Sequence, residues 1–218
     1  MPSFITSDGV RIRYERRGDG APIFVCQGGP NNNCDTLIRD LAPLTATYTM
    51  IFHDYRGSGM SATAPVESYR FDRLADGLDE LREHLGYEAV SVLAHSMGGL
   101  VALEFALRHP DHCERLALVG TTPCGAARPM ATPAIRALSI RGVSRPQRAG
   151  IWFLCAWSWR GSSSNGPRRR DAVMVAGGDL LVSGVVHAQR TVLDDVGHEV
   201  FIEAPTEAFD ALRAFLNG

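Results

Sequence analysis

A single serine, Ser96, stands between an apolar run and two glycines in the segment SVLAHSMGG, residues 91–99. The apolar run predicts a strand and the residues from Met97 onward predict a helix, so Ser96 lies at a strand-to-helix turn. Such a turn can hold a serine hydroxyl as an exposed nucleophile. The same serine could instead simply cap the helix, a role that requires no partner. A nucleophile requires a base, an acid that orients the base, and backbone donors for an oxyanion.

A candidate for the base comes late in the chain. His198 lies in the segment VLDDVGHEVFIEAP, in a loop that follows a predicted strand. His53 ends another predicted strand and is the serious rival. Four other histidines have simpler structural explanations, because they end or follow helices or lie in loops: His84, His109, His112 and His187.

A candidate for the acid is Asp179, which directly follows a short apolar run in VMVAGGDLLVS. The chain order serine, aspartate, histidine then matches one known solution to the geometry of a catalytic triad. Only 18 residues separate Asp179 from His198, which leaves little room for a helix between two strands. Asp194 and Asp195 are therefore alternative acids.

Two backbone N–H groups aimed at one point can stabilise a tetrahedral oxyanion. We expect one from Met97, the residue after the nucleophile. The loop QGGPNNN follows another predicted strand, and Gly29 is its better donor because Pro30 has no N–H. The glycine pair in this loop could also be an ordinary turn without a catalytic role.

The elements that must position these residues alternate along the chain. Asp8-Gly9 joins two segments that alternate apolar and polar residues, which predicts an antiparallel hairpin. Short apolar runs then predict strands buried on both faces, with helical patterns between several of them. We therefore predict an α/β fold with a mostly parallel, doubly wound sheet that binds ligands at the carboxyl ends of its strands. The predicted strands after the hairpin are Ile23–Cys26, Thr49–His53, Ala89–Leu93, Leu116–Val119, Ala172–Val175 and Thr191–Leu193, and the predicted helices are Phe71–Leu85, Met97–Arg108 and Phe209–Leu216.

Residues 125–170 interrupt this alternation. They contain four prolines and the loop RGSSSNGPRRR, and we interpret them as a short lid inserted into a core of residues 1–124 and 171–218. All three tryptophans lie in its segment GIWFLCAWSW: Trp152, Trp157 and Trp159. In a helix they could form an apolar, substrate-binding wall over Ser96. They could also attach the lid to the sheet or bury a homodimer contact.

The composition excludes several classes of protein. The chain has 218 residues, 45% of them hydrophobic and 21% charged, with a net charge of −2. It lacks a membrane-spanning run and a secretory signal pattern, so we expect a cytoplasmic location. Five cysteines without CxxC spacing indicate neither a disulfide framework nor a zinc site. Nine arginines lie between Arg128 and Arg170 and can attract anions, but no nucleic-acid-binding motif accompanies them.

Several motifs together resemble the α/β-hydrolase superfamily over nearly the whole chain: QGGP, HDYRGSGMS at residues 53–61, AHSMGG, the strand-end Asp179 and GHEVFIEAP. The resemblance implies the α/β-hydrolase fold. It also implies that DYRGSGMS shapes a tight turn and has no catalytic role. Gln27 departs from the family, which usually has histidine at the start of the oxyanion loop.

These residues and the resemblance favour a serine hydrolase that cleaves a small-molecule ester or thioester through Ser96, His198 and Asp179. We expect no cofactor, no metal and no nucleic-acid partner. A peptidase that resembles proline iminopeptidases is an alternative, suggested by GGP and DYRGSG, although the lid lacks acidic groups to hold a substrate ammonium. A catalytically silent binding protein on the same scaffold is another alternative. It is motivated by the short lid and by the short segment between Asp179 and His198.

Overall fold

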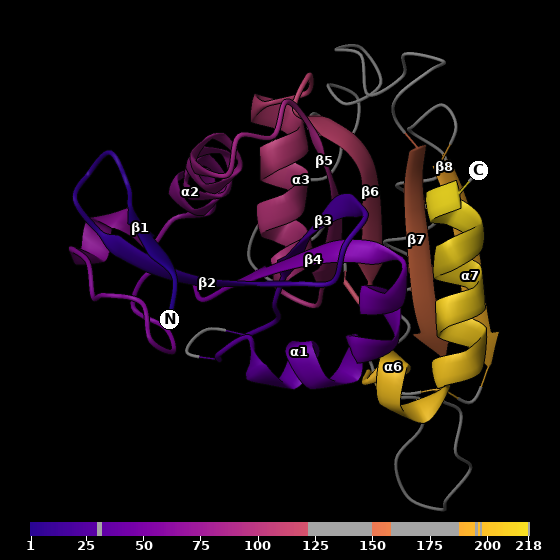
Figure 1. Ribbon diagram of the computed structural model, residues 1–218. Helices are drawn as coiled ribbons and strands as arrows, with labels where there is room; N and C mark the ends of the chain where they lie inside the picture. The colour runs from indigo at the N-terminus through magenta and orange to yellow at the C-terminus, as the bar shows by residue number, and fades with distance from the viewer. Residues whose placement is uncertain (30–31, 122–149, 158–187, 195, 197, 218) are drawn as a thin grey trace, which may run out of the picture.

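A mixed β-sheet forms the centre of the computed structural model, which describes residues 1–29, 32–121, 150–157, 188–194, 196 and 198–217. Within these residues the sheet has eight strands in the order β1-β2-β4-β3-β5-β6-β7-β8 (Figure 1). The strands are β1 (Ser3–Ile5), β2 (Arg11–Arg17), β3 (Ala21–Cys26), β4 (Tyr48–His53), β5 (Val90–His95), β6 (Cys113–Val119), β7 (Gly150–Trp157) and β8 (Ala188–Asp194). The α-helices are α1 (Asp35–Asp40), α2 (Phe71–His84), α3 (Gly98–Arg108), α6 (Val200–Glu203) and α7 (Pro205–Asn217).

The predicted α/β fold with an N-terminal hairpin is confirmed. β1 and β2 pair antiparallel, and the N–H of Gly9 donates to the carbonyl oxygen of Thr6 over 2.8 Å to close the turn between them. β2 also pairs antiparallel with β4. Across the rest of the sheet, in the order β4-β3-β5-β6-β7-β8, each strand is parallel to the next. The loops after these parallel strands therefore meet at one edge of the sheet.

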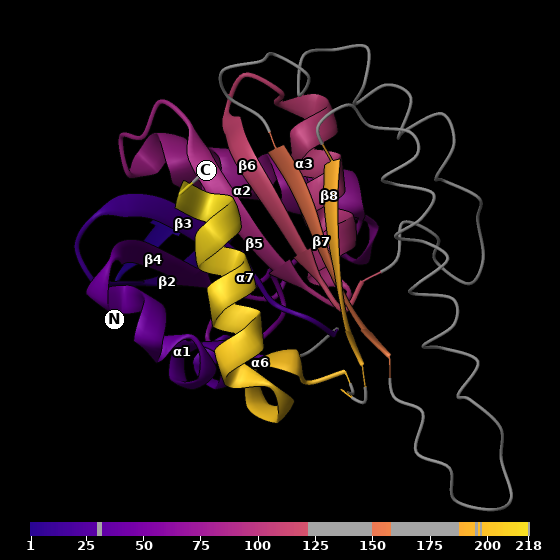
Figure 2. The same ribbon diagram turned by 90° about the vertical axis from the view of Figure 1, so that its right-hand side faces the viewer.

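Successive residues of the central strands face opposite sides of the sheet and pack under different helices. On β3, Phe24 belongs to the apolar cluster that contains residues of α2 and α3, whereas Ile23 and Val25 belong to the cluster with α1, α6 and α7. Figures 1 and 2 show these two helical layers on either side of the sheet. Both faces are covered, which explains why the strands are apolar runs without alternation.

β7 corrects one prediction from the sequence. Residues 150–157, which we assigned to the lid, form a strand parallel to β6 and β8 (Figure 2). The segment GIWFLCAW is uncharged and rich in aromatic residues, as suits a strand in a parallel sheet, but the prolines and arginines around it suggested an insertion.

A helix through Trp152 and Trp157, the arrangement in which we considered the apolar wall, does not form, because their backbone lies in the sheet. The substrate-binding role of the three tryptophans stays a prediction. Trp159, the parts of the predicted lid on either side of β7, and the predicted strand Ala172–Val175 lie outside the described residues.

The DYRGSGMS turn has the structural role that we expected. The buried carboxylate of Asp54 accepts hydrogen bonds from the N–H groups of Cys34 at 2.8 Å and Met60 at 2.9 Å. Arg56, also buried, pairs with Asp8 of the hairpin turn at 2.7 Å. Hydrogen bonds from Arg73 and Arg56 lower the pKa of the Asp8 carboxyl far below its usual range. These contacts fix the turn after β4 to the first hairpin.

None of the helices in the described part of the chain has the length and apolar character that crossing a bilayer requires.

Candidate active site

Ser96 occupies a strained turn between β5 and α3. Its φ is +54°, and it is the one non-glycine residue with positive φ among those that the structure describes. Left-handed backbone costs an ordinary side chain roughly 1–2 kcal/mol. The turn is held by the Ser96 N–H, which donates to the carbonyl oxygen of Val119 over 3.0 Å, and by the Gly99 N–H, which donates to the Ser96 carbonyl oxygen over 3.0 Å. This geometry is the one predicted for a nucleophile elbow.

Gly98 explains why small residues follow the serine. A Cβ at this position would lie 2.3 Å from the carbonyl oxygen of Cys26 and 2.6 Å from that of Gln27. These are backbone atoms of β3 and of the loop that follows it, so they cannot easily move aside. Only glycine lets α3 start this close to the neighbouring strand, and the close approach brings the Gln27–Gly29 loop next to Ser96.

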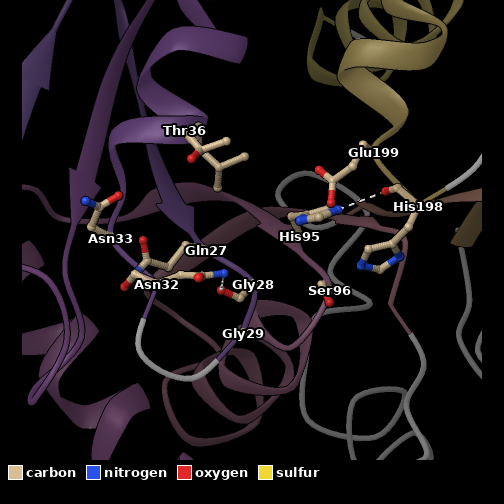
Figure 3. A pocket seen from close by; sticks show the side chains of 11 residues that line it. Gln27, Gly28, Gly29, Asn32, Asn33, Thr36, His95, Ser96, His198 and Glu199 are labelled. Atoms are coloured by element: carbon tan, nitrogen blue, oxygen red, sulfur yellow. Dashed lines mark hydrogen bonds between the residues drawn. The ribbon is translucent and has the colours of Figure 1, made fainter.

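Ser96 and His198 line the same open pocket, with a volume of about 280 Å³. In Figure 3 the Ser96 side chain lies between the Gln27–Gly29 loop and the His198 ring. The structure thus brings together the predicted nucleophile, base and oxyanion loop from three separate parts of the chain. The complete lining is Gln27, Gly28, Gly29, Asn32, Asn33, Thr36, Leu37, His95, Ser96, His198 and Glu199.

The two predicted oxyanion donors, Gly29 and Met97, come from different segments of the chain. Gly29 lines the pocket, and Met97 is the residue directly before α3. Within the described part of the chain, neither N–H donates a hydrogen bond to another backbone group. The side chain of Gln27 anchors the loop in place of the family's usual histidine, since its Nε2 donates to the carbonyl oxygen of Asn32 over 2.7 Å.

His198 lies over the carboxyl end of β6. A Cβ added to Gly120, which follows β6 with a φ of +55°, would lie 3.4 Å from Nδ1 of His198. The ring of His95 also lies close by, with its centroid 4.8 Å from that of His198 and 45° between the two planes. Gly120 therefore lies in van der Waals range of the ring of the candidate base, and its positive φ favours glycine at this position.

His95, directly before the nucleophile, is buried, and its Nε2 lies 3.0 Å from the main-chain carbonyl oxygen of His198. A carbonyl oxygen only accepts hydrogen bonds, so Nε2 of His95 carries the ring proton and donates the hydrogen bond. This contact ties the loop of the candidate base to the turn of the candidate nucleophile. From the sequence we assigned His95 no role, although its place beside Ser96 was a signal.

The predicted acid, Asp179, lies outside the described residues, as does Asp195. Asp194 is the last residue of β8. The catalytic roles of these three aspartates stay predictions.

His53, the rival base, does not reach the pocket of Ser96. It ends β4, is 4% exposed, and lines a separate cavity of about 20 Å³ with Asp54 and Arg73. Its ring lies edge-on to Tyr55 with the centroids 5.1 Å apart. Burial lowers the pKa of His53 to about 4, which keeps the ring neutral at neutral pH. The structure therefore places His198, and not His53, beside the candidate nucleophile.

One group in the pocket could also hold a cation. His95, His198 and Glu199 each offer one ligand atom, and these atoms lie within 4.8 Å of one another. An ion bound there would occupy a ring nitrogen of His198, which as a base must accept a proton. Metal binding and base catalysis by His198 would therefore exclude each other.

Comparisons with known proteins agree with this fold. The α/β-hydrolase fold family matches residues 21–153. The chain is 38% identical over 109 residues to the non-heme chloroperoxidase CPO-A1 of Kitasatospora aureofaciens, a match that covers 50% of this chain and 39% of that protein. It is 30% identical over 126 residues to a proline iminopeptidase of Heyndrickxia coagulans, covering 56% of this chain and 42% of that protein. The matches thus span about two fifths of the length of these curated relatives.

The fold is also similar to that of the esterase EaEST from Exiguobacterium antarcticum, with a TM-score of 0.77, 18% sequence identity and 99% of both chains covered. At this identity the likeness concerns the fold. Because the family match covers more than half of the sequence, the chain belongs to the α/β-hydrolase fold family.

Proposed function

We propose that the chain is a serine hydrolase that cleaves a small ester or thioester through an acyl-enzyme. The observation that carries the proposal is the left-handed backbone of Ser96 in a pocket that it shares with His198. A serine that only capped a helix has extended backbone and gains nothing from this strain. Strain of this kind persists where it aims a side chain at a functional site.

In the first half of the proposed reaction, Oγ of Ser96 attacks the acyl carbonyl carbon while the ring of His198 takes the hydroxyl proton. The carbonyl π electrons move to oxygen, and the N–H groups of Gly29 and Met97 donate hydrogen bonds to this oxyanion. As the intermediate collapses, the imidazolium of His198 gives its proton to the leaving alkoxide or thiolate.

In the second half, His198 removes a proton from water, and the resulting hydroxide attacks the acyl carbon on Ser96. Collapse of this second intermediate releases a carboxylic acid and returns the proton to Oγ. We assign the orientation of the His198 ring to Asp179, which stabilises the imidazolium in both halves.

The pocket favours short acyl groups with hydrogen-bonding atoms. Its volume of about 280 Å³ lies at the lower end for small-molecule sites. Amide and hydroxyl groups of Gln27, Asn32, Asn33 and Thr36 line it. Oε1 of Gln27 is buried and has no hydrogen-bond partner among the described residues.

Labelling with a fluorophosphonate, followed by mass spectrometry of the adduct, tests the proposal. We expect one adduct at Ser96 that is absent in Ser96→Ala. Esters and thioesters graded from acetyl to octanoyl then define the substrate, and we expect the highest kcat/KM for the short chains. A protein that takes up no label and hydrolyses none of these substrates is a binding protein, which would contradict the proposal.

A second candidate function is an aminopeptidase that resembles proline iminopeptidases. The observation that favours it is Glu199, an exposed carboxylate in the lining of the pocket, which could pair with a substrate ammonium. The similarity to the iminopeptidase of Heyndrickxia coagulans supports it. Hydrolysis of proline p-nitroanilide, lost in Glu199→Gln while ester hydrolysis continues, would favour this candidate over the esterase.

A further inference from the structure

Two histidines and an aspartate meet on the surface, outside the pocket of Ser96. His109 and His112 lie in the turn between α3 and β6, and Asp79 lies on α2. One ligand atom from each lies within 4.8 Å of the other two. Nδ1 of His112 is 2.7 Å from Oδ1 of Asp79, and Nδ1 of His109 is 3.5 Å from Oδ2 of the same carboxylate. The two rings are nearly parallel, with 6° between their planes.

The second nitrogen of His109 decides what Nδ1 can do. Nε2 lies 3.1 Å from Oδ1 of Asp76, an acceptor when ionised, so Nε2 carries the proton of the ring. In the neutral ring Nδ1 then presents a lone pair to Oδ2 of Asp79, which is also an acceptor. Two facing acceptors require a proton or a cation between them. A carboxylate on the far nitrogen is also the usual arrangement around histidines that bind metals.

Arginines donate hydrogen bonds to the carboxylates of both Asp79 and Asp76. Nε of Arg82 donates to Oδ1 of Asp79 over 2.7 Å, which leaves Oδ2 facing His109. Arg108 donates twice to Asp76, at 2.8 and 2.9 Å. The ligating carboxylate is therefore paired with an arginine and fixed in orientation.

We propose that Asp79, His109 and His112 bind a divalent transition-metal ion such as Zn²⁺, with water completing the coordination. Bonds of about 2.1 Å place the ligands of a tetrahedral zinc site roughly 3.4 Å apart. The 3.5 Å between His109 Nδ1 and Asp79 Oδ2 already matches this distance. Two imidazoles and one carboxylate suit Zn²⁺ better than Mg²⁺, which prefers oxygen ligands alone.

Only His112 has to rearrange. Its side chain is 37% exposed, so its ring can turn towards the ion without disturbing the core. Nδ1 exchanges its hydrogen bond with Asp79 for a bond to the metal, and the ring proton then resides on Nε2. The bound ion joins α2 to the turn after α3, so it stabilises the packing of these two helices.

Titration calorimetry and thermal unfolding of the full chain with ZnCl₂, and with MgCl₂ as the comparison, test this site. We expect one zinc ion per chain. With zinc at 100 times its dissociation constant, the melting temperature rises by roughly 5–10 °C. His112→Asn keeps a donor for Asp79 but loses the imidazole ligand, and we expect at least a roughly 10-fold weaker affinity for zinc.

Two further variants locate the ion. His84→Ala removes another exposed histidine from α2 and should bind zinc like the wild type. Glu199→Gln removes a ligand from the group beside Ser96 and should also leave this binding unchanged. Zinc binding that survives in His112→Asn, or is lost in Glu199→Gln, overturns the proposal, as does the absence of zinc binding to the wild type.

Discussion

Nε2 of His95 donates a hydrogen bond to the main-chain carbonyl oxygen of His198 over 3.0 Å. The donor precedes the candidate nucleophile, and the acceptor belongs to the candidate base. These residues are 103 positions apart in the sequence. The contact therefore couples the positions of the two segments that carry the candidate nucleophile and the candidate base, which the proposed reaction requires side by side.

His95→Phe tests this coupling, because phenylalanine keeps the ring volume and loses the donor. We expect kcat to fall about 10- to 100-fold, since removing one partner of a buried hydrogen bond costs roughly 1–3 kcal/mol. KM should change little, and His95→Gln should recover part of kcat because its amide can donate. A lower melting temperature with unchanged kcat and an unchanged pH profile would assign His95 a structural role only.

Ser96→Ala and Ser96→Gly separate the chemistry at this residue from its backbone strain. Both variants lose the hydroxyl, so we expect kcat to fall by about 10³-fold or more in each. Glycine adopts a φ of +54° without the cost that alanine incurs, so Ser96→Gly should melt roughly 2–4 °C above Ser96→Ala. Thermal unfolding and ester hydrolysis measure the two effects. More than a tenth of the wild-type activity in either variant would exclude Ser96 as the nucleophile.

Asp179→Asn and Asp195→Asn distinguish the two candidate acids. An amide in place of the orienting carboxylate stabilises the wrong tautomer of the base and lowers kcat by about 10⁴-fold in a related triad. We expect a large loss for Asp179→Asn and almost none for Asp195→Asn, measured by ester hydrolysis at saturating substrate. The reverse result would assign the acid to the turn after β8.

His53 predicts a loss of stability in mild acid. Burial lowers the pKa of His53 to about 4 in the folded chain, against 6.5 in the unfolded chain. Between these values the unfolded state binds more protons, so the free energy of unfolding rises with pH, and roughly 3 kcal/mol is lost from pH 6.5 down to 4. His53→Gln removes this dependence. Urea unfolding of both proteins across this range should give converging midpoints at low pH, and parallel curves would contradict the assignment.

Local patterns in the sequence determined the hairpin, the central strands and the nucleophile turn. Asp8-Gly9 requires only neighbouring residues to form a turn, and the period of the apolar residues distinguishes β5 from α3. Short elements such as α1 and α6 escaped prediction. A helix of four to six residues gains its stability from tertiary packing and not from its own propensity.

The tertiary structure decided which histidine meets Ser96. His53 and His198 both follow strands, and no local pattern distinguishes them. The fold separates them: His198 lies near Gly120 and lines the pocket of Ser96, whereas His53 is buried beside Tyr55.

The sequence by itself determined the fold class and the position of the candidate nucleophile, because both follow from residue types that are close together in the chain. Only the tertiary structure brought Asn32, Thr36 and Glu199 into one pocket with Ser96, and placed β7 in the sheet. The physical reason is that pocket walls and strand neighbours are contacts between distant segments. Their free energy comes from packing that forms only once the helices cover both faces of the sheet.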